Sequence, residues 1–102
     1  MPGTLDLLIL KALSLEELHG LAIARRVEQI TKGAFQVKAG SLFPALYRME
    51  RAGWVKAAPS KSANRRDAKY YMLTAKGRKQ LAEEQKAWSS ILAALTPALR
   101  TT

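Results

Sequence analysis

Between Gly40 and Val55, one proline, one tyrosine and two arginines lie at helical spacing, and this pattern points to chemistry more clearly than any other in the chain. At about 100° per residue, a helix over this stretch has two unlike faces. The apolar face comprises Leu42, Ala45, Leu46 and Met49. The other face comprises Pro44, Tyr47, Arg48 and Arg51, with no acid at its centre. Because guanidinium groups bind phosphates and the edges of bases, we expect this helix to lie on an anionic surface.

The residue patterns that support catalysis or metal binding are missing from the sequence. His19 is the single histidine and there is no cysteine, so a set of convergent metal ligands is not available. The acids at 16–17 and 83–84 form adjacent pairs whose carboxylates point in different directions, which does not suit an acid/base pair. No glycine-rich phosphate loop or nucleophile motif is present. We therefore predict no enzyme activity, no metal and no cofactor.

The positive charge of the chain is concentrated in one block. The net charge is +9, from 17 Lys and Arg against 8 Asp and Glu. Residues 38–79 contain eleven bases and two acids, 11 − 2 = +9, whereas the remainder contains six of each, 6 − 6 = 0. A basic block between neutral ends is typical of a surface that binds phosphates.

The size and composition are those of one small globular protein. The 102 residues suit a single compact unit, and 48% of them are hydrophobic. The longest apolar run near the start is Leu7–Leu10, closed by Lys11, so we expect no membrane-spanning segment. The N-terminus lacks the basic region of a signal peptide. The sequence therefore predicts a cytoplasmic protein without a membrane partner.

Three helices precede the point at which the periodicity changes. We expect a helix over residues 5–13, a break at 15–20 and a second helix over 20–31. The third helix is expected at 41–52, with Ser41 as its N-cap, Pro44 at its third position and Gly53 ending it in a left-handed conformation. Two short helices followed by a helix with an Arg/Tyr outer face predict a helix-turn-helix, with 41–52 as the recognition helix.

After Gly53 the hydrophobic period becomes 2, which predicts two strands at 54–58 and 69–73. The loop that joins them is basic and contains Lys61, Arg65 and Arg66. Two strands with a basic loop directly after a helix-turn-helix form a wing. The predicted fold class is therefore mainly α with a small β-wing (α+β), a winged helix occupying residues 1–74.

A long last helix follows, with Thr74 as its predicted N-cap, and we expect Pro97 to stop or kink it at about residue 96. A stripe of apolar residues with one polar member is spaced 4, 3, 4, 3, 4 along it, as in a coiled coil: Leu81, Gln85, Trp88, Leu92, Leu95 and Leu99. Residues 75–102 are therefore predicted to form a dimerisation helix. Leu7 and Leu10 lie outside the core stripe of the first helix and are expected to complete the interface.

Several motifs, together with their order along the chain, resemble those of the PadR family of bacterial transcriptional regulators. They are the sequence GSLFPALYRME at 40–50, the triplet GWV at 53–55, KYYMLT at 69–74 with Gly77, LDLLIL at 5–10 and the pair His19–Gly20. The resemblance covers residues 3–95, and the single C-terminal helix is similar to that of the short-form members. Phe43 and Leu21 depart from the family pattern, since tyrosine is usual at both positions.

The resemblance implies a homodimeric repressor that binds an inverted-repeat operator in double-stranded DNA. In such proteins the third helix enters the major groove, the wing contacts the backbone or the minor groove, and the first and last helices form the dimer. Several members respond to small aromatic ligands, some in a cavity beside an aromatic residue of the last helix. Trp88 occupies a comparable place here, with Leu92 one turn further on.

The residues predicted to contact DNA combine the cationic face with the basic loop. They are Lys38, Ser41, Pro44, Tyr47, Arg48, Arg51, Lys61, Arg65 and Arg66. A solvated helix face and a solubilising loop are the alternatives for these residues, and dimer packing is the alternative for Trp88. For the whole protein, the alternatives are a winged-helix module that docks an acidic partner and a non-specific nucleic-acid binder.

Overall fold

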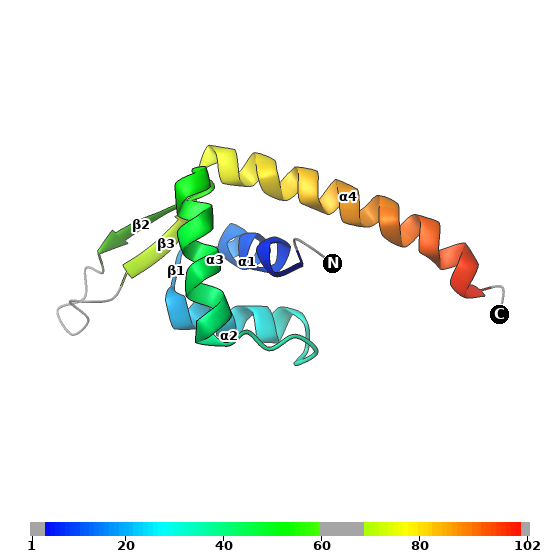
Figure 1. The fold of residues 1–102 in the computed structure, drawn as a ribbon, viewed down its shortest axis with the longest axis horizontal. Helices are drawn as coiled ribbons and strands as arrows, with labels where there is room; N and C mark the ends of the chain where they lie inside the picture. Colours follow the sequence, from blue (N-terminus) through cyan, green and yellow to red (C-terminus); the bar gives the residue numbers. More distant parts are fainter. Residues whose placement is uncertain (1–3, 60–68, 101–102) are drawn as a thin grey trace.

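The fold is a winged helix with one long helix projecting from it (Figure 1). The structure is a computed structural model that describes residues 4–59 and 69–100. In chain order, the elements are α1 (Thr4–Leu15), β1 (Leu18–His19), α2 (Gly20–Ile30), α3 (Ala39–Ala52), β2 (Val55–Pro59), β3 (Lys69–Leu73) and α4 (Ala75–Arg100). The predicted fold class is thereby confirmed.

The sheet has three antiparallel strands in the order β1-β3-β2, one more than the sequence predicted. β2 and β3 pair from Val55 with Leu73 to Pro59 with Lys69, as expected of a wing. β1 adds Leu18 opposite Tyr71 and His19 opposite Tyr70, within the stretch predicted to be a break. Two residues are too few to show a period of 2. The short strand therefore exists only through its pairing with β3.

The core lies where the three N-terminal helices, the sheet and the start of α4 meet. Its fully buried members include the predicted apolar face of α3, which is confirmed. The other buried apolar residues are Ile9, Leu10, Ala12 and Leu13 of α1, Ile23 and Val27 of α2, Val55 and Tyr71 of the sheet, and Leu81 of α4. This packing fixes which face of α3 points outwards.

The start of α3 differs from the prediction. The helix begins two residues earlier, with Lys38 as the N-cap residue, and no side chain caps it. Ser41 is therefore the third residue of the helix and Pro44 the sixth, so Pro44 lacks the N–H that would bond to the carbonyl of Gly40. Gly53, with φ of 84°, ends the helix in the left-handed conformation that was predicted.

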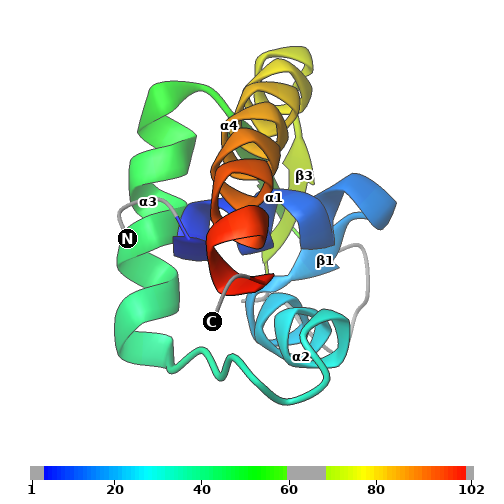
Figure 2. The same cartoon turned by 90° about the vertical axis from the view of Figure 1, so that its right-hand side faces the viewer.

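α4 begins against the sheet and α1 and then extends away from the rest of the molecule (Figures 1 and 2). Its 26 residues correspond to about 39 Å of helix, and the molecule measures 57 × 27 × 22 Å. The helix continues through Pro97 to Arg100, so of the stop or kink expected at Pro97 the stop does not occur. None of the helices in the described ranges is both long enough and apolar enough to cross a bilayer.

Candidate nucleic-acid interface

The outward face of α3 carries an arginine and a tyrosine that contact each other. Nη1 of Arg51 donates a hydrogen bond of 3.2 Å to Oη of Tyr47. The Arg51 guanidinium carbon also lies 5.7 Å from the centroid of the Tyr47 ring, within the range of a cation–π contact. Tyr47 is 61% exposed, and no carboxylate among the described residues pairs with Arg51. The pair therefore presents an uncompensated positive charge together with an aromatic ring.

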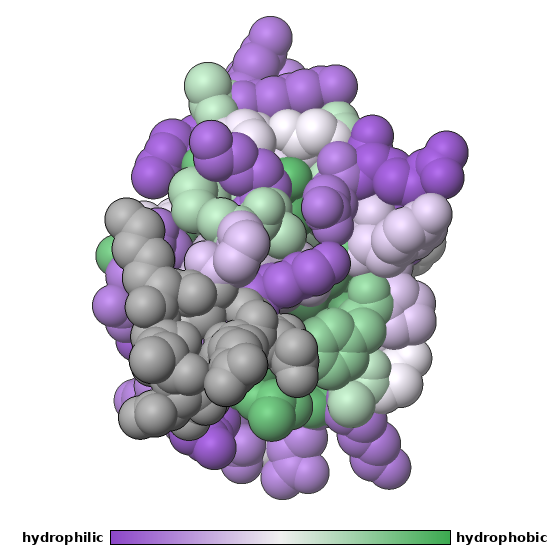
Figure 3. Space-filling view, turned by 90° about the vertical axis from the view of Figure 1, so that its left-hand side faces the viewer, coloured by the Kyte–Doolittle hydropathy of each residue, from purple (hydrophilic) through white to green (hydrophobic). Residues whose placement is uncertain are grey.

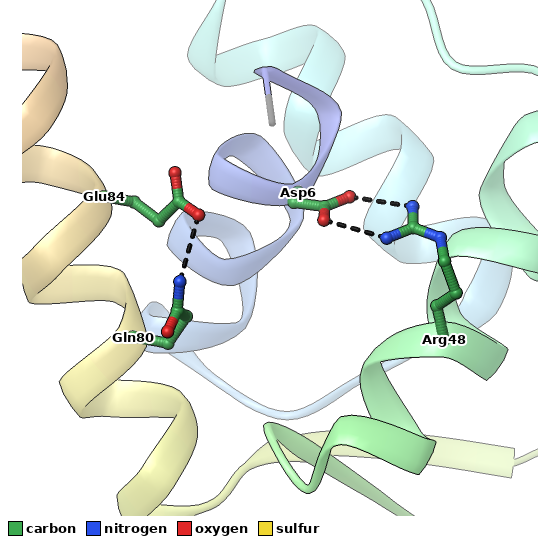
Figure 4. A network of polar contacts seen from close by, with 4 residues as sticks. All are labelled: Asp6, Arg48, Gln80 and Glu84. Atoms are coloured by element: carbon green, nitrogen blue, oxygen red, sulfur yellow. Dashed lines mark hydrogen bonds and ion pairs between the residues drawn. The ribbon is translucent and has the colours of Figure 1, made fainter. Parts of the chain in front are cut away.

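Arg48, on the same helix, is paired with an acid from α1 (Figure 4). Its Nη1 and Nη2 donate hydrogen bonds of 3.0 Å each to Oδ2 and Oδ1 of Asp6. The hydrogen bonds to Asp6 and the attraction of its charge raise the pKa of Arg48, which keeps the guanidinium charged. The face of α3 itself carries no acid, but Asp6 of α1 balances one of its two arginines. Asp6 is 42 positions away in the chain, and only the packing of α1 on the core brings it to Arg48.

The C-terminal end of α3 is held to the start of α4 by a single hydroxyl. Oγ1 of Thr74 donates to the carbonyl of Gly53 at 2.6 Å and accepts from the backbone N–H of Gly77 at 3.0 Å. The second contact is an N-cap bond, which confirms the predicted role of Thr74. A Cβ at Gly77 would overlap the carbonyl oxygen of Trp54, so the first turn of α4 lies directly against the chain that leaves α3.

The N-terminal part of α3 packs on α2 through an aromatic ring. A Cβ at Gly20 would lie 2.6 Å from Cε1 of Phe43, which shows how closely the ring approaches the first residue of α2. Phe43 remains 42% exposed. A side chain at position 20 would therefore displace the Phe43 ring, and this contact joins the N-terminal part of α3 to α2.

Further basic residues surround the end of α3. Figure 3 looks onto the end of the molecule that carries β2 and β3, and hydrophilic side chains predominate in its upper part, where α3 ends and α4 begins. The exposed bases of this region are Arg51, Lys56, Lys76, Arg78 and Lys79. Cδ of Lys76 lies 3.5 Å from the position of a Cβ at Gly53, so this side chain runs along the end of α3. The four residues other than Arg51 belong to the basic block at 38–79 but to none of its motifs.

The remaining residues of the predicted DNA contacts are distributed as follows. Lys38, Ser41 and Pro44 are exposed at the N-terminal half of α3, on the surface that also carries Tyr47. Lys61, Arg65 and Arg66 fall in 60–68, outside the described residues. Six of the predicted contacts lie in the described residues, and all six are exposed along α3. Five of them have no acidic partner among these residues, and Arg48 is the exception.

A groove of about 470 Å³ lies between α1 and α4, away from this face. Its lining is mostly apolar and consists of Leu7, Leu8, Lys11, Gln85, Trp88, Ser89 and Leu92. Trp88 and Leu92 thus line one groove, as their predicted role as cavity residues requires, and Leu7 is on its opposite side. Leu10 is fully buried and Leu81 is 7% exposed within the single chain, so the subunit's own core covers these two of the predicted interface residues. The stripe on α4 could not show which of its members the subunit's own core would cover.

Tyr71 and His19, which lie outside the face of α3, pack against other parts of the fold. Burial raises the pKa of Tyr71, and the negative charge of Glu50 raises it further, so this phenol stays neutral at physiological pH. The ring of His19 meets that of Tyr70 edge to face, with centroids 6.1 Å apart. Within residues 4–59 and 69–100, no group of three or more His, Cys, Asp or Glu side chains could hold a metal ion.

A comparison with protein families assigns most of the chain. Residues 9–83 match the model of the transcriptional regulator PadR-like family. The chain belongs to the PadR-like family. The resemblance read from the motifs at 40–50, 53–55 and 69–74 is thereby confirmed, and the match extends from α1 into α4.

Solved structures of PadR-like proteins share this fold. A PadR family transcription regulator from Clostridium difficile is 30% identical, with 95% of this chain and 99% of that chain covered and a TM-score of 0.81. A PadR-like transcriptional regulator from Bacillus cereus is 28% identical, with coverage of 95% and 92% and a TM-score of 0.81. Bacillus subtilis PadR, solved in complex with operator DNA, is 22% identical with a TM-score of 0.71. That match covers 80% of this chain and 46% of the longer protein.

Proposed function

We propose that this PadR-like chain is a sequence-specific, dimeric DNA-binding regulator that acts as a repressor. α3 enters the major groove of an inverted-repeat operator, and the basic segment 59–68 lies on the backbone. The observation that carries the proposal is the outward face of α3, where Tyr47 and Arg51 are exposed and Arg51 has no acidic partner among the described residues. Bacillus subtilis PadR, whose fold is similar, was solved in complex with operator DNA, which supports duplex DNA as the partner.

The dimeric state is proposed from the distal part of α4. Leu92 and Leu95 are 58% and 48% exposed, on a helix that extends beyond the rest of the fold. Two large apolar side chains one turn apart are expected to be covered by a second copy, because apolar seams of this spacing are typical of paired helices. We accordingly propose residues 1–74 as the DNA-binding unit and 75–102 as the dimerisation helix. A two-fold dimer matches a palindromic site.

We also propose that a small aromatic effector binds in the groove between α1 and α4. The volume of about 470 Å³ is in the range of small-molecule sites. Trp88 offers a ring for stacking, and the lining is mostly apolar with a few polar groups. Since α1 and α4 both contribute to the groove and to the proposed dimer, an occupied groove is expected to change the spacing of the two recognition helices.

The test begins with selection of binding sites from a pool of random duplexes. The selected duplex is then titrated against a scrambled duplex and single-stranded RNA at two salt concentrations. Alanine at the arginine that contacts a base edge, Arg48 or Arg51, is expected to weaken binding of the selected duplex by about 1–3 kcal/mol, and Lys86→Ala, which removes the same charge from α4, is the control. Alanine at Lys61, Arg65 and Arg66 should weaken both duplexes alike and flatten the salt dependence.

The outcome that contradicts the proposal is equal affinity for the selected and scrambled duplexes at both salt concentrations. Such a result would favour a non-specific binder, and binding to an acidic polypeptide without duplex preference would favour a protein-docking module. Repeating the titration with planar aromatic compounds tests the effector. Release of the duplex by the wild type, but not by the Trp88→Leu variant, is the expected result.

A further inference from the structure

The ion pair between Asp6 and Arg48 is strongly asymmetric in its exposure. The Asp6 side chain is only 14% exposed, whereas that of Arg48 is 60% exposed. Asp6 is in the first turn of α1, where the helix dipole favours a negative charge. The carboxylate is therefore the fixed member of the pair, and the guanidinium is the member that it presents to the solvent beside Tyr47 and Arg51.

Two physical consequences follow for Arg48. Both carboxylate oxygens bind it, so two of its five N–H groups are occupied, the plane of the guanidinium is set, and three N–H groups remain for another acceptor. The adjacent negative charge also cancels its positive charge. An arginine in this state has little attraction for phosphates, because that attraction depends on net charge and on the release of counterions.

Arg51 shows the opposite combination one turn further along α3. Its partner is the neutral Tyr47, and no carboxylate of the described residues offsets its charge. One arginine is thus oriented and neutralised, and the other is charged and held only by an exposed phenol. The two side chains are suited to different parts of a duplex: a fixed fork suits a base edge, and a free charge suits a phosphate.

We propose that Asp6 is a specificity-determining residue, which orients Arg48 for contact with base edges and prevents it from acting as a general phosphate contact. This inference rests on the proposed DNA-binding function. Asp6 itself does not touch the duplex and acts through Arg48. The two arginines therefore have different roles. Arg48 contributes to the choice of sequence, and Arg51 contributes to the affinity for any duplex.

The experiment compares Asp6→Asn with wild type on the selected and scrambled duplexes over a series of salt concentrations. Asn has nearly the same size but does not balance the charge. We expect the affinity for scrambled duplex to rise and its salt slope to steepen by about 0.9, the contribution of one additional phosphate contact. The ratio of the affinities for selected and scrambled duplex should fall at least about fivefold, the lower bound for loss of a good bidentate base contact.

A matched control separates this effect from the change in net charge. Glu16→Gln also raises the net charge by one unit, but it disrupts a different ion pair. Glu16 directly follows α1, and its partner Arg26 is on α2. Glu16→Gln should leave the affinity ratio unchanged. In the same assay, Arg51→Ala should flatten the salt slope by about 0.9, whereas Arg48→Ala should lower the affinity ratio and change the slope little. Asp6→Glu, which keeps the charge, should recover most of the wild-type ratio.

The results that overturn the inference are distinct from failure of the proposed function. If Asp6→Asn lowers the thermal stability but leaves the affinity ratio and the salt slope at their wild-type values, the pair is only a clamp between α1 and α3. If Arg48→Ala flattens the slope as much as Arg51→Ala, then Arg48 binds phosphate and the inference is wrong. Failure of the proposed function would appear earlier, as a wild-type protein that does not distinguish the two duplexes.

Discussion

At the level of single residues, two glycines let neighbouring segments approach α3 closely. At each of them, an atom of another segment lies where a Cβ would be. At Gly77 this neighbour is the Trp54 carbonyl, and at Gly20 it is the Phe43 ring. A backbone carbonyl cannot turn away as the end of a flexible side chain can. Gly40 is different, because nothing lies within 4 Å of a Cβ built there.

Gly77→Ala is therefore expected to destabilise the protein, although alanine is the better helix former. The overlap with the Trp54 carbonyl should lower the free energy of unfolding by about 1–3 kcal/mol. Gly40→Ala, the matched change in an open position of α3, should be neutral or stabilising by up to about 1 kcal/mol. Urea titrations at one protein concentration measure both variants. Equal stability of the two would show that the contact between α4 and Trp54 is not close.

At the level of elements, the link between α3 and α4 passes through Thr74. One hydroxyl bonds both the residue that ends α3 and the first turn of α4. The backbone N–H of Thr74 also bonds to the Trp54 carbonyl at 3.0 Å, so Thr74 is tied to both residues that follow α3. A change in the position of α4 is therefore expected to move the end of α3 with it.

Thr74→Ala should lower the free energy of unfolding by about 1–2 kcal/mol, the usual cost of removing an N-cap side chain. Thr96→Ala serves as the control, since its hydroxyl bonds only to the carbonyl of Leu92 within the exposed part of α4 and should change stability by less than about 0.5 kcal/mol. Thermal unfolding followed by circular dichroism measures the difference. Thr74→Ser, which keeps the hydroxyl, should recover most of the loss, and its failure to do so would argue against the cap as the cause.

At the level of the whole molecule, the winged unit buries its large apolar core side chains, whereas the long arm of α4 exposes apolar side chains to solvent. The core residues of the unit are covered by the chain itself, whereas Leu92 and Leu95 on the arm are not. The arm therefore has apolar surface that folding of one chain leaves in water, and association of two chains can remove it.

Replacing both Leu92 and Leu95 by Glu should convert the proposed dimer into a monomer. Burying one such leucine contributes about 1.5–3 kcal/mol, so the dissociation constant should rise at least about a hundredfold. The helical content of each chain should remain, because neither side chain belongs to the core. Sedimentation velocity measures the change, and Ala93→Glu with Ala94→Glu adds the same charge to the same turn as a control. A dimer that persists after the leucine substitutions would place the interface elsewhere.

The features that the sequence by itself determined are those set by near neighbours in the chain. The two faces of α3, the strands of the wing and the left-handed end at Gly53 were all predicted correctly, because a helix repeats every 3.6 residues and a strand every 2. The basic block from 38 to 79 also needed no structure, since it depends on composition alone. The motifs within this block carried the family resemblance, which the match over residues 9–83 confirmed.

The tertiary structure decided what depends on contacts between distant segments. β1 exists because β3 pairs with it, Leu10 is covered because α1 packs into the core, and Asp6 neutralises Arg48 because that packing brings α1 beside α3. None of these contacts leaves a periodic signal, since the partners are chosen by the packing of whole elements. Which of two similar arginines on one helix carries an uncompensated charge was therefore decided by the fold.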